Sequence, residues 1–175
     1  MNELEKLGLK YGTDKIGKHN YLPVYYDLFK DKRNEVKKVL EIGVAEGASL
    51  FMWRDFFPNA KIYGGELDQD RVDLLKDQNR IEVIKFDQGS VKDLNNLVDN
   101  ILLDIDLIVD DGSHVPSDQL FTCLGIMPFV SKNTIYIIED VVEPGIKNFI
   151  TKYDAEVIEV GKRYDDRLII VRNYE

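Results

Sequence analysis

Two acidic segments in the second half of the chain contain residue types that act together in catalysis. They are DDGSH at positions 110–114 and ED at positions 139–140. Each follows a short run rich in β-branched residues, which predicts the end of a strand in a parallel sheet. Ligands of open α/β sheets bind outside the carboxyl ends of the strands, so we expect both acidic pairs to face one crevice. Neighbouring carboxylates hold protons or share a cation, and oxygen ligands suit Mg²⁺ or Mn²⁺ better than zinc. The segments therefore predict a divalent metal site.

His114 stands three residues after Asp111, in a loop before a helix-length segment that starts at Pro116. It lies within reach of a hydroxyl bound at the metal, and the ordinary pKa of histidine suits a general base. An alternative needs no catalysis, because an Asp-Gly-Ser turn also caps a helix. The pattern predicts a histidine base and leaves the helix-capping interpretation open.

A pair of glycines follows the first predicted strand. Gly43 and Gly47 let the backbone turn tightly and approach a ligand before the next helix, so a nucleoside fits against this turn. Their G-x-x-x-G spacing differs from the G-x-G-x-x-G of dinucleotide-binding proteins, and no G-K-[ST] follows for a triphosphate. Alone, the glycine pair is a weak signal.

The second and third predicted strands also end in polar residues. Glu66, with Asp68 as its substitute, is placed to accept hydrogen bonds from the hydroxyls of a ribose. Asp87 and Gln88 follow the third strand, where a short acceptor reads an adenine amino group. A single acidic strand end is most often a loop residue or a helix cap. Three in succession favour a nucleoside-binding crevice.

The elements that would position these residues alternate along the chain. Apolar runs predict five parallel strands, at 38–42, 61–63, 81–86, 106–109 and 134–138. Segments of helical length separate them, at 49–57, 70–77, 91–100 and 116–130. A short segment at 146–152 then precedes a hairpin of two runs, 155–160 and 167–172. We predict a Rossmann-like α/β fold with a seven-stranded, mostly parallel sheet, a C-terminal antiparallel hairpin and helices on both faces.

The chain has 175 residues, which suits a single domain over 1–175. We expect residues 1–35 to form two short helices around a lid-like loop, and residues 36–175 to form the core. The formal net charge of −9 disfavours a nucleic-acid partner, because a phosphate backbone is bound by clustered Lys and Arg. The first ten residues contain no long apolar run, so we expect no signal peptide, no membrane span and a cytoplasmic protein.

Cysteine and aromatic residues add two expectations. Cys123 is the only cysteine, which excludes an internal disulfide and a cysteine-rich zinc site. Aromatic residues crowd the first core helix, where core packing is the favoured interpretation and a homo-oligomer interface the alternative. They are Phe51, Trp53, Phe56 and Phe57.

Four segments resemble the metal-dependent sugar O-methyltransferases that modify macrolide antibiotics, of the mycinamicin type. They are LEIGVAEGASLFMW at 40–53, IYGGELD at 62–68, DLIVDDGSH at 106–114 and YIIED at 136–140. The segment YGTDKIGKHNYLPVYYDLF at 11–29 is also similar to the stretch that precedes the core of such enzymes. The tally of five strands and a closing hairpin resembles the class I methyltransferase sheet rather than a fold of six parallel strands.

The resemblance implies S-adenosyl-L-methionine as cofactor, Mg²⁺ as metal and a sugar or glycosylated small molecule as methyl acceptor. It implies a magnesium site of Asp111, Glu139 and Asp140. His114, beside Asp111, would be the catalytic base. The cofactor would be surrounded by Glu41, Gly43, Gly47, Ser49, Glu66, Asp87 and Gln88. A lid near the cofactor or substrate would contain Tyr11, Thr13, Lys15 and His19.

The resemblance does not extend to the long N-terminal domain of the macrolide enzymes, so neither the acceptor nor the oligomeric state follows from it. A methyltransferase for a catechol-like or other small-metabolite hydroxyl would use similar metal chemistry. A non-catalytic nucleoside-binding or assembly module would leave the acidic pairs as solvated strand ends. A nicotinamide oxidoreductase is disfavoured by the glycine spacing and by the hairpin.

Overall fold

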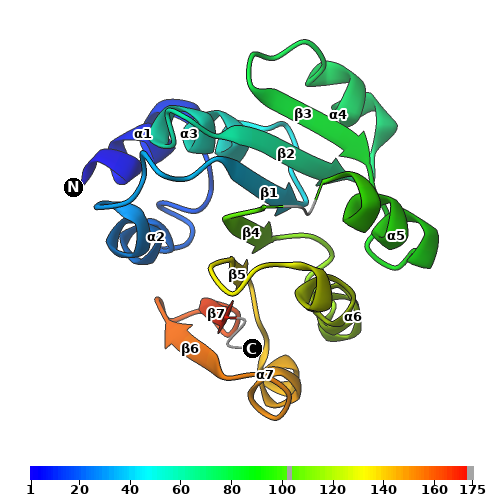
Figure 1. The fold of residues 1–175 in the computed structure, drawn as a ribbon. Helices are drawn as coiled ribbons and strands as arrows, with labels where there is room; N and C mark the ends of the chain where they lie inside the picture. The colour runs from blue at the N-terminus through cyan, green and yellow to red at the C-terminus, as the bar shows by residue number, and fades with distance from the viewer. Residues whose placement is uncertain (102–103, 173–175) are drawn as a thin grey trace.

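One sheet of seven strands crosses the described part of the chain (Figure 1). The computed structural model describes residues 1–101 and 104–172. The strand order is β3-β2-β1-β4-β5-β7-β6. Neighbours from β3 to β5 are parallel, and β7 is antiparallel to both β5 and β6. The strands are β1 (Lys38–Ile42), β2 (Lys61–Glu66), β3 (Ile81–Lys85), β4 (Leu107–Asp110), β5 (Ile135–Ile138), β6 (Ala155–Glu159) and β7 (Arg167–Arg172).

Helices cover both faces of this sheet. One face carries α1 (Glu3–Tyr11), α2 (Leu22–Phe29) and α3 (Ala48–Phe56). The other carries α5 (Val91–Asn100), α6 (Pro116–Ile126), the short 3₁₀ helix η1 (Met127–Phe129) and α7 (Glu143–Ile150). Helix α4 (Gln69–Leu74) joins β2 to β3. The fold predicted from the sequence, a mostly parallel sheet closed by an antiparallel pair, is confirmed.

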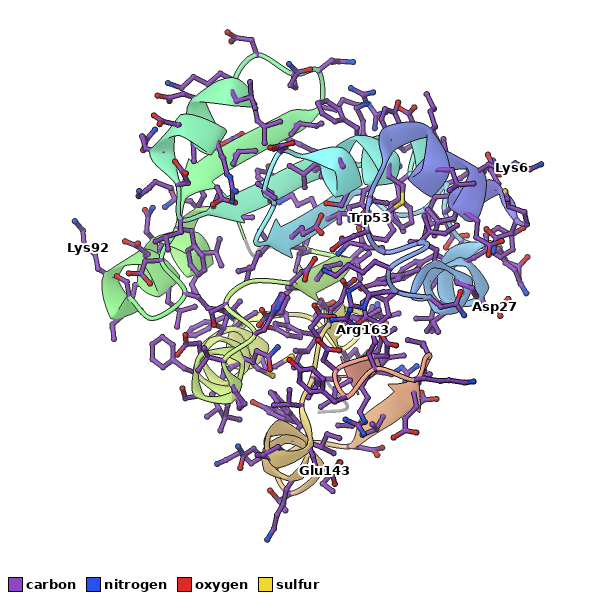
Figure 2. All side chains as sticks on the ribbon, turned by 180° about the vertical axis from the view of Figure 1, so that it is seen from behind. Lys6, Asp27, Trp53, Lys92, Glu143 and Arg163 are labelled. Atoms are coloured by element: carbon purple, nitrogen blue, oxygen red, sulfur yellow. The ribbon has the colours of Figure 1, made fainter. Side chains whose placement is uncertain are left out.

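Alternation along the strands builds two cores. In β1, Val39 belongs to the cluster beneath α1–α3, and its neighbour Leu40 belongs to the cluster beneath α5–α7. The two-residue period of a strand requires this division. Trp53 is fully buried in the first cluster, whereas Lys6 and Lys92 extend outward from their helices (Figure 2). Burial on both faces explains why the strands read as continuous apolar runs.

Several boundaries differ from the sequence prediction, and α4 and α7, for example, end at Leu74 and Ile150 rather than at 77 and 152. Two of the differences have clear physical reasons. The second strand, expected at 61–63, continues to Glu66 because Gly64 and Gly65 maintain parallel pairing to β1 and β3. The helix expected at 116–130 is α-helical only to Ile126 and continues as η1, where Pro128 has no N–H to donate. None of the described helices is long and apolar enough to cross a membrane.

Helix α1 is fastened to α3 through Asp55. The Asp55 carboxylate accepts hydrogen bonds from Lys10 Nζ at 2.9 Å, from Arg54 Nη2 at 3.1 Å and from the Tyr11 hydroxyl. Partial burial raises the pKa of Asp55, but these donors outweigh it and lower the pKa to about 2. A lowered pKa in the folded state contributes stability above the ordinary value of 3.8 and loses it as the pH falls toward 2.

We expect Asp55→Asn to lower the free energy of unfolding by about 1–2 kcal/mol at pH 7, because the amide keeps the shape of the side chain without its charge. The difference from the parent protein should shrink as the pH falls from about 4 to about 2. Urea unfolding at neutral and acidic pH measures this difference in the free energy of unfolding. Asp99→Asn, on the exposed side of α5, is the matched control. An equal loss at every pH would contradict the assigned pKa.

Candidate active site

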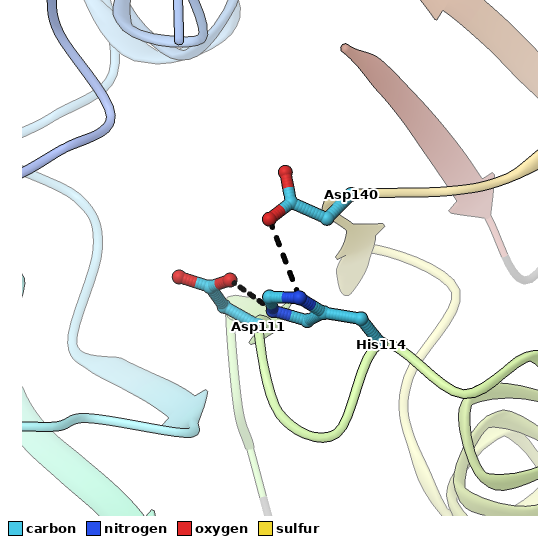
Figure 3. Close-up of side chains that lie close together, drawn as sticks. All are labelled: Asp111, His114 and Asp140. Atoms are coloured by element: carbon cyan, nitrogen blue, oxygen red, sulfur yellow. Dashed lines mark hydrogen bonds and ion pairs between the residues drawn. The ribbon is translucent and has the colours of Figure 1, made fainter. Parts of the chain in front are cut away.

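The carboxyl ends of β4 and β5 bring two carboxylates and a histidine together (Figure 3). Asp111 directly follows β4, Asp140 follows β5, and His114 lies in the loop before α6. His114 Nε2 is 3.0 Å from Asp111 Oδ1, and His114 Nδ1 is 3.4 Å from Asp140 Oδ2. One donor atom of each residue lies within 4.8 Å of the other two. The structure thus groups three of the four residues that the sequence assigned to a metal and a base.

The backbone at His114 and Asp140 is left-handed. Its φ is +57° at His114 and +53° at Asp140, angles that non-glycine residues rarely adopt and that cluster at functional sites. The imidazole lies between the two carboxylates, and its side chain is 42% exposed, so a molecule from solvent can reach it. The hydrogen bond to Asp111 is the main cause that raises the pKa of His114, against the effect of burial.

A buried lysine occupies the inner side of the acidic cluster. Lys15 Nζ lies 3.0 Å from Glu41 Oε1, 2.7 Å from Asp111 Oδ2 and 2.6 Å from Glu139 Oε2. Burial lowers the pKa of Lys15, but these three carboxylates outweigh it and raise the pKa well above its usual value. Burial also raises the pKa of Asp111, yet Lys15 and His114 lower it to about 2. Lys15 is therefore a charged partner of the acids, a role that sequence reasoning missed.

Glu139 faces this lysine rather than the group of Asp111, His114 and Asp140. The Tyr25 hydroxyl donates to Glu139 Oε1 at 2.6 Å, while Lys15 holds Oε2. Burial is the main cause that raises the pKa of Glu139, and the charge of Lys15 opposes it. The assignment of Glu139 as a magnesium ligand stays a prediction from the resemblance.

Asp140 is held by residues from the loop that leads into α2. The Tyr21 hydroxyl donates to Asp140 Oδ1. His19 Nδ1 lies 2.9 Å from Asp166 Oδ1 and 3.5 Å from Asp140 Oδ1. Sequence reasoning placed His19 in a lid and missed Tyr21 and Asp166. For Tyr21 the available signal was the row of polar and aromatic residues HNYLPVYY at 19–26.

Asp110 does not share the crevice with Asp111, which corrects the expectation that both acidic pairs face it. Its carboxylate is buried and accepts from Tyr136 Oη at 2.8 Å and from Gln88 Nε2 at 2.8 and 2.9 Å. Burial raises the pKa of Asp110 to about 6 although these donors oppose it. The reason is geometric, because consecutive residues at a strand end point to opposite sides.

Two adjoining cavities open beside the acidic residues, one of about 260 Å³ and one of about 510 Å³. Both are lined by Asp14, Gly43, Ala45, Arg71 and Asp111. Among the predicted cofactor residues, the smaller cavity is also lined by Thr13 and Ser49. The larger cavity is also lined by Glu66, Asp87, Gln88 and the base candidate His114.

Three predicted cofactor residues are not on the walls of these two cavities. Glu41 is fully buried, and Trp53 Nε1 donates to its Oε2 at 3.0 Å. Gly47 is the N-cap of α3, with a φ of +85°. Asp68 caps α4 by accepting a hydrogen bond from the Asp70 N–H at 2.9 Å, so the helix-cap interpretation describes its contact.

Glu66 and Gln88 line the larger cavity and also bond within the protein. Glu66 accepts hydrogen bonds from the Ala45 and Asp68 N–H groups, each at 2.9 Å. Gln88 donates to Asp110 through Nε2 and accepts from the Ser113 N–H at 2.9 Å through Oε1. Both side chains therefore tie neighbouring strand-end loops together.

The parallel sheet closed by an antiparallel pair, with a glycine turn after β1 and cavities at the strand ends, is the architecture of the class I methyltransferase fold. No family model matches the chain. The mycinamicin VI 2''-O-methyltransferase of Micromonospora griseorubida is 35% identical to it over 147 residues, which cover 79% of this chain and 36% of that enzyme. The 8-demethyl-8-alpha-L-rhamnosyl tetracenomycin-C 2'-O-methyltransferase of Streptomyces olivaceus is 32% identical over 145 residues, which cover 78% and 37%.

A solved structure agrees with these relatives. The MycE methyltransferase from the mycinamycin biosynthetic pathway, in complex with Mg and SAH, matches with a TM-score of 0.71 and 34% identity over 79% of this chain and 37% of that chain. The chain spans little more than a third of the length of the curated relatives it matches. The chain has the fold of the class I S-adenosylmethionine-dependent methyltransferases, and the resemblance seen in the sequence is confirmed.

Gly43 brings the glycine turn directly against the loop that carries Asp111. Its φ is +79°, and a Cβ at this position would lie 2.1 Å from the Asp111 carbonyl oxygen. A backbone atom cannot rotate away from such a clash as a side chain can. The turn and the loop therefore tolerate only glycine at this position.

We expect Gly43→Ala to lower the free energy of unfolding by about 2–4 kcal/mol, because strain and a backbone clash act together. The matched control is Gly12→Ala, where φ is +74° but no atom lies within 4 Å of the added Cβ. That control should lose only about 1 kcal/mol. Chemical denaturation of both variants measures the difference, and equal losses would show that the clash is relieved.

Proposed function

We propose that this chain is an S-adenosyl-L-methionine-dependent and Mg²⁺-dependent O-methyltransferase that acts on a hydroxyl group of a sugar or glycosylated small molecule. The observation that carries the proposal is the position of His114 between Asp111 and Asp140, on the wall of a cavity that begins at the glycine turn. The names of both curated relatives, which describe methyl transfer to sugar-bearing molecules, support the acceptor class.

The two cavities suit the two ends of the cofactor. Ligand pockets in proteins typically have volumes of about 300–1,000 Å³, and the larger cavity offers Glu66 and Asp87 to a nucleoside. The smaller cavity offers Thr13 and Ser49 beside the start of α3, whose first turn has no side-chain cap. Free N–H groups at a helix N-terminus favour a carboxylate such as that of methionine.

Asp111 and Asp140 fit a divalent cation. Their oxygens come from two adjacent strand ends, lie within 4.8 Å of each other and of a His114 nitrogen, and are the ligand type that Mg²⁺ prefers. We therefore assign the metal to these two carboxylates, and Glu139 remains a third candidate from the resemblance. When bound, the metal supplies Lewis acidity that lowers the pKa of a hydroxyl, and the cofactor supplies the methyl group.

His114 has the position of a proton acceptor. Its ring lines the larger cavity, is partly exposed, and has a carboxylate oxygen near each nitrogen. A carboxylate beside the ring orients it and stabilises the imidazolium that forms when a proton is taken up. The protein's remaining task is to hold the acceptor oxygen and the methyl carbon in line, about 3–3.5 Å apart.

We expect the purified protein to bind S-adenosyl-L-methionine with micromolar affinity in calorimetric titration, because polar residues such as Ser49, Glu66 and Asp87 line the two adjoining cavities. Titrations with and without Mg²⁺ test whether the cation contributes. NADH is the matched control, since it shares the adenosine but fits another class of enzyme. A folded protein that bound neither S-adenosyl-L-methionine nor S-adenosylhomocysteine would overturn the proposal.

We expect His114→Ala to lower kcat by about a hundredfold or more while changing the affinity for S-adenosyl-L-methionine by less than about threefold. The physical reason is that a general base acts on the acceptor hydroxyl and not on the cofactor. Turnover is followed as S-adenosylhomocysteine release with a panel of sugar diols, and exposed Ser117→Ala on α6 is the control. Unchanged turnover in His114→Ala would remove the histidine from the mechanism.

A further inference from the structure

Three buried or partly buried carboxylates meet at the inner side of the strand ends. Glu41 lies on β1, Asp111 follows β4 and Glu139 follows β5, and these are three neighbouring strands of the sheet. The side chains of Glu41 and Glu139 are 0% and 1% exposed. Charges withdrawn from water at such short range are costly and repel one another unless a cation pairs with them. This arrangement therefore needs a resident positive charge.

Lys15 supplies that charge. Its ammonium has three N–H donors, and it lies 2.6–3.0 Å from one oxygen of each of the three carboxylates. It is carried by the loop at 12–20, which is closed on itself by a bridge between Ile16 and Asn20. The loop thus places the ammonium of Lys15 inside the acidic centre, which is the group of Glu41, Asp111, Glu139 and Asp140.

Asp111 is shared between the inner and outer halves of this centre. Its Oδ2 contacts Lys15, and its Oδ1 contacts His114 on the side where Asp140 lies. A divalent cation held by Asp111 and Asp140 would therefore sit near the ammonium of Lys15. Two cations that share one carboxylate compete for its charge and repel each other.

We propose that Lys15 is a positioning residue whose ammonium is the internal counter-ion of the acidic centre. The ammonium holds the Asp111 and Glu139 carboxylates in place and competes with the divalent cation for their charge. The inference rests on the proposed function, because it treats Asp111 as a metal ligand. It predicts that the centre without Lys15 binds a divalent cation more tightly. A lysine that only fills space would affect stability and leave this affinity unchanged.

The test uses Mn²⁺ as the probe, with neither cofactor nor acceptor present. Electron paramagnetic resonance of free Mn²⁺ gives the affinity, and thermal unfolding in EDTA and in Mn²⁺ gives the stability. Lys15→Met is compared with Lys18→Met, a matched control on the same loop whose side chain is 49% exposed and pairs with Asp14 at 2.9 Å. Both substitutions remove one positive charge from residues three positions apart.

We expect Lys15→Met to bind Mn²⁺ at least about tenfold more tightly than the parent. In EDTA it should unfold at a lower temperature than the parent, and added Mn²⁺ should raise its unfolding temperature more than that of the parent. Lys18→Met should behave as the parent. Unchanged or weaker Mn²⁺ binding by Lys15→Met would overturn the proposal. If Lys15→Met bound Mn²⁺ and the parent did not, the proposal for Lys15 would stand and the proposed metal dependence of the parent would be contradicted. If neither protein bound Mn²⁺, the proposal for Lys15 and the proposed metal dependence would both be overturned.

A second variant covers the case in which Lys15→Met does not fold in EDTA. The double substitution Lys15→Met/Glu139→Gln removes one charge of each sign from the buried centre. It should unfold at a higher temperature than Lys15→Met, and its Mn²⁺ affinity should lie between those of the single variant and the parent. A double variant no more stable than the single one would show that the ion pair is not what Lys15 provides.

Discussion

Acidic side chains buried at neighbouring strand ends have to be neutralised, and much of the molecule around the site serves this requirement. Lys15 supplies the positive charge, Tyr25 and Tyr21 donate to Glu139 and Asp140, and Trp53 donates to Glu41. Most of these partners come from the first 25 residues. The N-terminal helices and their loop therefore form the inner wall of the site, and the carboxylates of the sheet would lack partners without them.

The same requirement explains why the site has two unlike sides. The inner side is buried and its acids are paired with a protein cation, whereas the outer side exposes His114 and leaves Asp111 Oδ1 and Asp140 facing it. Solvent reaches the outer side at His114, and Lys15 also lines the smaller cavity. The division lets one cluster of acids provide both a rigid support and a reactive surface.

Much of this was predictable from the sequence because it depends on local pattern. The strands, the closing hairpin and the grouping of Asp111, His114 and Asp140 follow from apolar runs and from where each run ends. Asp110 was misplaced because its side depends on the alternation at a single residue. Lys15 was not recognised as a partner because its contacts lie 96 and 124 residues away in sequence. Such pairings depend on how the loop packs, and no local signal encodes that.

The close approach of Gly43 to the Asp111 carbonyl joins the glycine turn after β1 to the loop after β4 with no side chain between them. A shift of either backbone is passed directly to the other, since neither has a flexible group to absorb it. Ligands on the two sides of this joint would then be thermodynamically linked, each changing the affinity for the other by the same factor. The two affinities therefore cannot be tuned independently of each other.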